Sequence, residues 1–254
     1  MNNIIYHYTT VGVLALILQN KTIRFNSLKN VDDMLDGSHN DVKNARNYLF
    51  VSCWSEDNHE SIPLWKMYSD NMSGIRIGIN RDLIKPLYKY VTNGKSVIKT
   101  RKIINITNNS LYCFTDNFKV KVKYDDYEQH KLIKLINLEN EELNSIEYTK
   151  LAGIKKKCWN FQNETRFVLL ATLSDGDGIF DKQNSIESLY NGLKKSNVEY
   201  IDMIFDDAVF SDMEILIGPN ASPASKIIIE SLINKFLPSF CGKIEHSNLL
   251  IRKQ

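Results

Sequence analysis

The chain has 254 residues, 43% of them hydrophobic, which is enough apolar material for a sizeable folded domain with a buried core. Its 32 Lys and Arg residues nearly balance 30 Asp and Glu residues, so the formal net charge is only +2. This balance gives no general electrostatic attraction to nucleic acids or membranes, and no apolar run approaches the roughly 18 residues that span a bilayer.

The cysteines and histidines follow no spacing that binds a metal or marks a redox pair. The four cysteines form no Cys-x-x-Cys pair, and none of the five histidines makes a His-x-x-x-His pair. The acidic loop from Asp175 to Asp181 lacks the glycine and the glutamate that an EF-hand calcium site requires. The N-terminus has no basic patch before a long apolar segment, as a secretory signal would. These features predict a cytoplasmic protein with reduced thiols, no metal and no membrane partner.

Hydrophobic periodicity in the first third of the chain predicts strands that alternate with short helices. β-Branched and aromatic residues form short runs typical of strands, whereas Val11, Leu14 and Leu18 recur at the spacing of a helix. Pro63 suits the first turn of a second helix. The predicted strands are 4–8, 22–25, 48–54 and 74–79, and the first predicted helix is 11–20.

The rest of the chain continues this mixture. Alternating patterns predict strands over 96–104 and 118–124, and leucines among charged residues predict a helix from Tyr127 to about Lys157. The remaining predicted helices are 186–193 and 222–236, and the remaining predicted strands are 200–205, 213–219 and 247–252. We therefore predict an α+β fold with a mixed or antiparallel sheet core and peripheral helices. It would form a single domain over residues 1–254 with a central helical insertion at about 83–157.

Charged residues inside apolar strands are the main candidates for chemistry. Glu164 and Arg166 lie one pleat apart on the same face of the predicted strand "ETRFVLLATL", and Gln162 precedes Glu164 by the same spacing. A buried carboxylate is costly unless it is paired. Glu164 is therefore either half of a structural ion pair with Arg166 or a lysine, or a functional group. His7 in "IIYHYTT" and Arg24 in "TIRF" repeat this pattern.

Other polar groups allow both functional and structural interpretations. Cys53 with His59 would suit a nucleophile and its base, although the end of a buried strand favours an inert thiol. His7 with Asp32 or Asp33 would suit a hydrolase, whereas the segment "NVDDMLDG" is typical of a capped turn. The lysine-rich segments "IKTRK" and "KVKVK" would give a basic face, either for nucleic acid or simply exposed to solvent.

Four motifs occur in the order found in a known family. They are "YHYTT" with "NKTIRFNSLKNVDDMLDG", then "FVSCWSEDN" with "LWKMYSDNMSGIRIGI", then "KCWNFQNETRFVL", and finally "EILIGPNAS". This series resembles a widespread prokaryotic family of domains of unknown function, family 2971. The resemblance covers most of the chain except about 83–148 and 173–196, and it supplies no reaction by itself.

A second resemblance implies a chemistry. The order of a strand with His, a helix with Tyr and a late strand with Glu is similar to that of NAD-dependent ADP-ribosyltransferases. The resemblance implies a split-sheet fold, His7 as a ribose contact, Tyr68 as the ring that stacks on nicotinamide, and Glu164 as the catalytic carboxylate. Gln162 would orient the acceptor, as in the Gln-x-Glu motif of some members. The implied NAD contacts are His7, Thr9, Arg24, Tyr68 and Arg166.

The chain departs from the superfamily pattern beside its histidine. Where a small glycine usually follows the histidine, this chain has Tyr8, in His7-Tyr8-Thr9. Tyr68 is assigned by its order in the chain and not by a matched local motif. The leading hypothesis is transfer of ADP-ribose from NAD to an unknown protein or nucleic-acid acceptor, as in a bacterial toxin or phage-defence effector. The alternative is a non-enzymatic module that binds a nucleotide or a partner.

Overall fold

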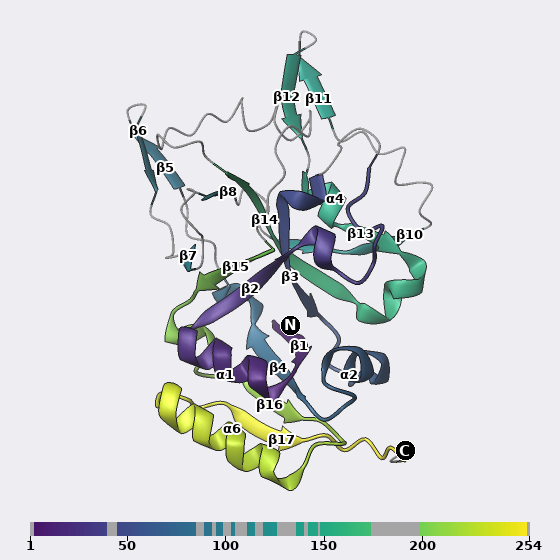
Figure 1. Cartoon of the computed structure of the whole chain (residues 1–254), viewed down its shortest axis with the longest axis vertical. Helices are drawn as coiled ribbons and strands as arrows, with labels where there is room; N and C mark the ends of the chain where they lie inside the picture. The colour runs from purple at the N-terminus through teal and green to yellow at the C-terminus, as the bar shows by residue number, and fades with distance from the viewer. Residues whose placement is uncertain are drawn as a thin grey trace.

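The computed structural model describes residues 3–39, 45–84, 119–125, 148–173 and 199–252, together with short strands between residues 89 and 146. The predicted helix at 186–193 and part of the predicted central insertion at about 83–157 lie outside the described residues. Within the described part, the fold is α+β with a large, mostly antiparallel sheet and few helices, as the sequence predicted (Figure 1).

Eleven strands form the central sheet, with the main order β17-β16-β4-β1-β3-β2-β15-β7, while β14 pairs with β3, β8 and β9. Three small two-stranded sheets lie outside it: β10 with β13, β11 with β12, and β5 with β6. The strands are β1 (Ile4–Thr9), β2 (Thr22–Ser27), β3 (Leu49–Ser55), β4 (Ile75–Asn80), β5 (Lys89–Thr92), β6 (Lys95–Ile98), β7 (Ile103–Ile104), β8 (Leu111–Phe114), β9 (Lys119–Lys121), β10 (Lys123–Asp125), β11 (Ile136–Glu139), β12 (Glu142–Ile146), β13 (Ile154–Lys156), β14 (Glu164–Leu173), β15 (Tyr200–Ile204), β16 (Glu214–Ile217) and β17 (Lys243–His246).

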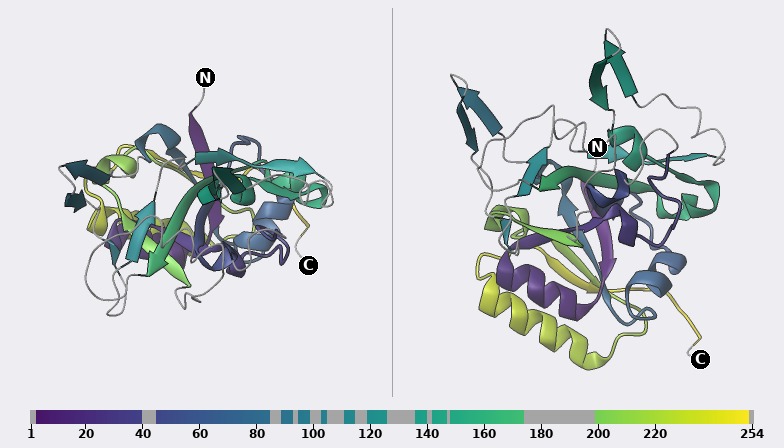
Figure 2. Two further views of the ribbon diagram at one scale, coloured as in Figure 1. Left: turned by 90° about the horizontal axis from the view of Figure 1, so that it is seen from above. Right: turned by 45° about the horizontal axis from the view of Figure 1, so that its top comes forward.

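Two helices, α1 and α6, lie side by side and pack on the sheet at one end of the molecule (Figures 1 and 2). Thr10 caps α1 by accepting a hydrogen bond from the Val13 amide, and Pro223 occupies the first turn of α6. Leu14 of α1 and Ile229 of α6 enter the main core. The helices are α1 (Val11–Asn20), α2 (Ile62–Tyr68), α4 (Tyr148–Ala152) and α6 (Pro223–Phe236), and short 3-10 turns occupy Leu28–Asn30, Ala45–Asn47, Arg81–Leu83, Lys157–Gln162 and Asp207–Val209.

The sheet splits along one edge of β3. Strand β14 pairs with β3 from Leu49 to Ser55, so β1 and β2 share the opposite edge. On that edge β1 reaches β3 only at Ser55, and β2 reaches it only at Phe50 and Val51. No described strand pairs with residues 52–54 on this edge. The two strands therefore diverge, and the gap between them provides room for a site.

Two predicted elements are wrong where they can be compared. The expected helix from Tyr127 to about Lys157 is replaced, in its described residues, by strands β11, β12 and β13 and the single turn of α4. Leucine spacing suggested a helix there, but Leu138 and Leu143 pair with each other across a short hairpin. The last strand is Lys243–His246, and the predicted strand at 247–252 is an extended tail instead. Its apolar residues Leu249 and Ile251 pack against Trp65 and its neighbours rather than joining the sheet.

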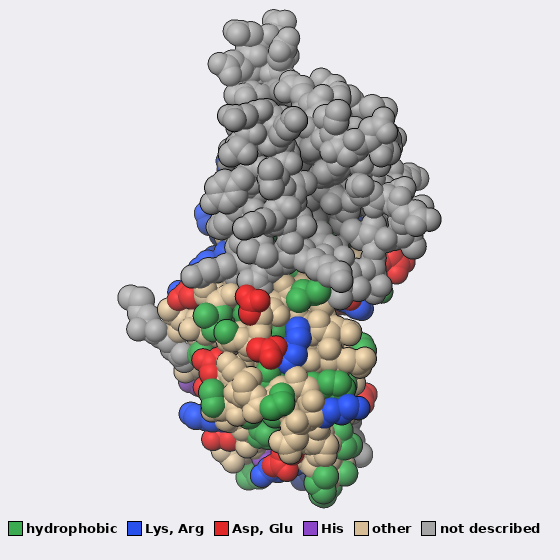
Figure 3. Space-filling view, turned by 90° about the vertical axis from the view of Figure 1, so that its left-hand side faces the viewer, with side chains coloured by type: hydrophobic (Ala, Val, Ile, Leu, Met, Phe, Trp, Pro, Cys, Tyr) green, Lys and Arg blue, Asp and Glu red, His purple; other side chains and the backbone are tan. Residues whose placement is uncertain are grey.

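None of the helices in the described ranges is long and apolar enough to cross a bilayer. On the face of the molecule shown in Figure 3, acidic and basic side chains are interspersed with apolar ones over the coloured region. In the basic segment 119–123, the described Lys119, Lys121 and Lys123 are exposed. Lys121 is occupied by an ion pair with Glu56. Lys99 and Arg101, which belong to the predicted basic segment "IKTRK", lie outside the described residues.

Candidate functional site

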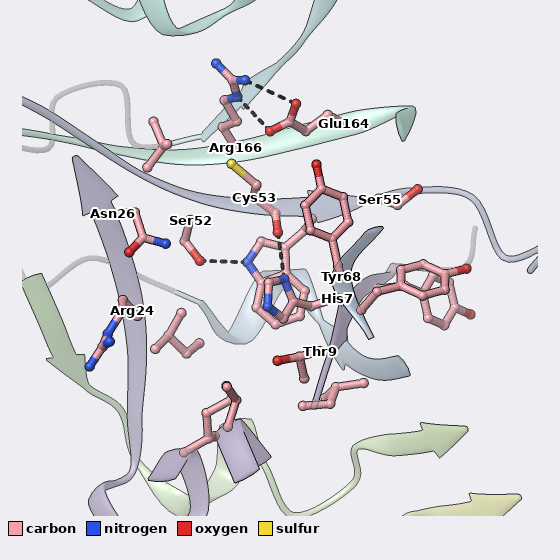
Figure 4. A pocket seen from close by; sticks show the side chains of 18 of the residues that line it. His7, Thr9, Arg24, Asn26, Ser52, Cys53, Ser55, Tyr68, Glu164 and Arg166 are labelled. Carbon is pink, nitrogen blue, oxygen red and sulfur yellow. Dashed lines mark hydrogen bonds and ion pairs between the residues drawn. The ribbon is translucent and has the colours of Figure 1, made fainter. Parts of the chain in front are cut away.

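A cavity of about 640 Å³ occupies the gap in the sheet. Strands β1, β2 and β3 form its floor, and α1, α2 and the beginning of β14 supply further walls. Small-molecule sites typically enclose about 300–1,000 Å³. All seven residues that the resemblance to ADP-ribosyltransferases implied line this one cavity: His7, Thr9, Arg24, Tyr68, Gln162, Glu164 and Arg166. Figure 4 labels all of them except Gln162.

His7 projects into the cavity from β1 because it shares a strand face with the core residue Ile5. Its Nδ1 lies 2.9 Å from the Cys53 carbonyl oxygen, and its ring lies beside Trp54 with centroids 5.2 Å apart (Figure 4). Burial lowers the pKa of His7, so the imidazole is neutral at pH 7. A neutral ring that donates through Nδ1 leaves Nε2 as an acceptor, a suitable partner for a ligand hydroxyl.

Glu164 begins β14 and is buried, and both of its carboxylate oxygens are occupied. Arg166 Nε lies 2.8 Å from Oε1, and Lys155 Nζ lies 3.4 Å from Oε2. Burial alone would raise the pKa of Glu164, but attraction to Arg166 and Lys155 outweighs it and lowers the pKa to about 2. The structural ion pair considered from the sequence is therefore present. It lies at a cavity wall and not on an outer face.

Arg166 is fully buried and held from three directions. Its Nη1 donates to Asp36 Oδ1 at 2.9 Å and to the Ala152 carbonyl oxygen at 2.8 Å, while its Nε donates to Glu164. With so many partners, the guanidinium fixes the carboxylate and has little freedom to bind a phosphate. Its role as an NAD contact, which the resemblance implied, stays a prediction.

Tyr68 and Gln162 meet across the cavity. The Gln162 amide Nε2 donates to the Tyr68 hydroxyl at 2.9 Å, and that hydroxyl donates to Asp32 Oδ2 at 2.6 Å. Burial and the neighbouring Asp32 carboxylate raise the pKa of Tyr68, so it remains a neutral phenol. The ring is therefore pinned by its hydroxyl, and its carbon face borders the cavity.

Arg24 and Thr9 lie at the cavity without joining this network. The Arg24 guanidinium pairs with Asp202 through Nε and Nη2, at 2.8 and 2.9 Å, and stacks on the Tyr200 ring. In Figure 4 its side chain points away from His7. Thr9 is buried at the C-terminal end of β1. The structure thus places His7, Tyr68, Gln162 and Glu164 around one cavity. The charge of Arg24 is paired with Asp202 instead.

Asp32 lines the same cavity as His7 and accepts from the Tyr68 hydroxyl, so that combination stays a prediction. The remaining polar groups differ from their functional interpretations. His59 bonds to Asp57 in an exposed turn and does not line the cavity that Cys53 lines. Burial raises the pKa of the Cys53 thiol, which keeps it protonated. Asp33 caps its own loop by accepting from the Leu35 amide. Within the described residues, no group of His, Cys, Asp and Glu is arranged to hold a metal ion.

Sequence reasoning missed three residues of the cavity wall and its support. Lys155 stands in "IKKKCW", where consecutive lysines suggest a solvated surface, and Asp36 precedes a glycine, which suggests a turn. Both are nevertheless buried. Trp54 ends the apolar run "FVSCW", which indicates a core residue, although it lines the cavity beside His7. The sequence carries no usable signal for Lys155, because the segment around it was predicted to be helical.

Comparison of the chain with protein-family models, with curated proteins and with solved structures found no match.

Proposed function

We propose that this protein cleaves NAD in the cytoplasm and transfers ADP-ribose to a macromolecular acceptor. The observation that carries the proposal is the common cavity of His7, Tyr68 and Glu164 in the split between β1 and β2. Its volume suits a nucleotide-sized ligand, and its walls combine aromatic rings with hydrogen-bond acceptors. These are the groups that the resemblance to ADP-ribosyltransferases implied.

The proposed roles follow from charge. When the bond from ribose C1′ to nicotinamide breaks, nicotinamide leaves with the electron pair and the sugar gains positive charge. An ionised carboxylate in a dry cavity stabilises that charge more than it stabilises the neutral ribose. Glu164 has the required charge, because its pKa of about 2 keeps it ionised at neutral pH. His7 Nε2 accepts from a ribose hydroxyl, and the Tyr68 ring borders the nicotinamide.

One feature favours a second candidate, a module that binds a nucleotide without cleaving it. Both oxygens of Glu164 already accept from cations, and Arg24 is paired with Asp202. Full pairing weakens the field that Glu164 exerts on a sugar cation, and it leaves Arg24 less available to a diphosphate. A binding module would tolerate this pairing, whereas an enzyme needs one oxygen of Glu164 to be released when the ligand binds.

Nicotinamide release from NAD by the purified chain separates the two candidates. We expect the wild-type protein to release nicotinamide, with water as the default acceptor, and Glu164→Gln to be slower by roughly 10²-fold or more. Glu56→Gln is the matched control, because Glu56 is also ion-paired, to Lys121 and Arg81, but does not line the cavity. NAD binding without release would favour the binding module. A chain that neither binds NAD nor releases nicotinamide would refute the proposed cleavage of NAD.

A further inference from the structure

Lys155 is a buried lysine whose surroundings differ from those of a surface amine. It lies on β13, which pairs in parallel with β10, and its residue is only 5% exposed. Its Nζ stands 4.7 Å from the centre of the Trp159 ring. Since a buried ammonium is costly unless it is paired, its polar partners explain why a lysine is tolerated there.

Those partners include two of the residues proposed for the reaction. Lys155 Nζ lies 2.7 Å from Gln162 Oε1 and 3.4 Å from Glu164 Oε2, and it lies 3.8 Å from Asp36. The short contact to Gln162 has a directional consequence. An ammonium only donates, so it selects the amide oxygen and turns the Gln162 NH2 group toward Tyr68.

The charges around Glu164 also require this lysine. Asp36 and Glu164 both bond to the single guanidinium of Arg166. Two buried carboxylates and one guanidinium leave one negative charge, and Lys155 supplies the fourth member that neutralises the group. The contact between Lys155 and Glu164 is the longer of the two ion pairs of that carboxylate. Oε2 of Glu164 also accepts from Arg166 Nη2, at 3.2 Å. A ligand hydroxyl can therefore replace the longer Lys155 contact while Arg166 still holds the carboxylate and Lys155 stays bonded to Gln162.

We propose that Lys155 is a positioning residue that fixes Glu164 and Gln162 relative to each other in the cavity wall. The proposal rests on the proposed cleavage of NAD. Lys155 acts through its neighbours: it holds the Glu164 carboxylate toward the cavity, sets the orientation of the Gln162 amide, and through Gln162 fixes the Tyr68 hydroxyl. When a ligand hydroxyl donates to Oε2 of Glu164, the contact between Lys155 and that oxygen breaks.

Steady-state kinetics of nicotinamide release tests this role with Lys155→Met and Lys155→Arg. We expect the methionine variant to lower kcat roughly 10–100-fold with little change in KM, because misplaced groups act mainly on the transition state. The arginine variant keeps the charge and the donors and should recover part of kcat. Lys121→Met is the matched control, because Lys121 also pairs with a glutamate but is exposed on β9 and does not line the cavity. It should keep the wild-type kcat.

A double-variant cycle separates positioning from mere stability. If Lys155 acts mainly through Glu164, adding Lys155→Met to Glu164→Gln should lower kcat much less than the same change does in the wild type, because only the effect through Gln162 remains. A wild-type enzyme that releases nicotinamide while Lys155→Met keeps the wild-type kcat would overturn this inference alone. The inference would also be overturned if Lys155→Met lowered kcat by the same factor in the wild type and in Glu164→Gln. A wild-type chain that releases no nicotinamide would refute the proposed function and this inference together.

Discussion

At the scale of single residues, the decisive feature is a carboxylate held between two cations. Glu164 is almost fully buried, and Arg166 and Lys155 each donate to it. Breaking such a buried arrangement by removing one partner typically costs about 3–5 kcal/mol, because a charge is left unpaired. The exposed pair between Lys226 and Glu230 belongs to the class that contributes about 0–1 kcal/mol. The buried set therefore contributes more to the stability of the fold than the exposed pair does.

The pH dependence of the free energy of unfolding should show the contribution of Glu164 and its ion pairs with Arg166 and Lys155. The pKa of Glu164 is lowered from 4.5 to about 2 by folding. Its stabilising contribution is thus fully present above pH 4.5 and is lost as the pH falls through about 2. We expect the free energy of unfolding of the wild type to exceed that of Glu164→Gln by an amount that shrinks, on the order of 3 kcal/mol, across this window.

Urea denaturation of both proteins between about pH 5 and about pH 2 measures this difference. Glu56→Gln is the control, because the Glu56 side chain is partly exposed. Its free energy of unfolding relative to the wild type should change less with pH. A difference between wild type and Glu164→Gln that stays constant over the whole range would contradict the assignment of the low pKa to Glu164.

At the scale of elements, the turn that follows α2 places Tyr68 at the cavity. Three successive residues, Asp70, Asn71 and Met72, have positive φ angles of 50°, 48° and 73°. This left-handed path brings the Gly74 amide to 2.7 Å from the Ser69 carbonyl oxygen and leads directly into β4. L-residues seldom adopt such angles, so the surrounding contacts must hold the turn in place.

Gly74 is the point where this turn meets β1 most closely. A Cβ atom at position 74 would overlap the Thr9 carbonyl oxygen and would crowd the Ser69 carbonyl oxygen, and both are backbone atoms that cannot move independently. We expect Gly74→Ala to lower the free energy of unfolding by about 3 kcal/mol, measured by urea denaturation. It should also displace Tyr68 and weaken NAD binding.

Gly12→Ala is the matched substitution. Gly12 lies in α1, where the nearest atom to a new Cβ is Thr10 Oγ1 at 3.7 Å. Because alanine favours a helix over glycine, this change should stabilise the protein by about 0.5–1 kcal/mol. If Gly74→Ala proved as harmless as Gly12→Ala, the turn would not be the constraint described.

At the scale of the whole molecule, the cavity exists because the sheet does not close. β14 lies along one edge of β3, and β1 and β2 diverge on the other. A ligand that fills the gap contacts both halves of the sheet, so binding must stabilise the folded state. By mass action the gain is about 2.7 kcal/mol at a ligand concentration of 100 times Kd.

Thermal unfolding with and without NAD tests the location of the ligand. We expect NAD to raise the Tm of the wild type and to raise it less, or not at all, for Asn26→Trp. Asn26 lines the cavity from β2 and is exposed, so the larger side chain obstructs the gap at little cost to folding (Figure 4). Ile227→Trp, an exposed position on α6, should keep the wild-type shift. An undiminished shift in Asn26→Trp would place NAD elsewhere.

Local pattern determined much of this protein before tertiary structure was considered. The strands around His7, Arg24, Cys53 and Glu164 were predictable because short runs of β-branched and aromatic residues favour an extended backbone. The pairing of Glu164 with Arg166 was also predictable, because the pleat puts residues two apart on one face. Both properties depend only on residues close together in the chain, so the sequence alone predicts them.

Only the tertiary structure decided which distant residues meet. Lys155 and Asp36 look like surface residues in the sequence, yet they complete the charge balance around Glu164 because β13 and the loop before β3 fold over the start of β14. The strands at 136–146 were mistaken for a helix, because leucine spacing alone does not distinguish a hairpin from an amphipathic helix. The cavity exists because β1 and β2 pair with β3 only at Ser55 and at Phe50 and Val51. Such pairing joins residues far apart in the chain, and no local sequence pattern encodes it.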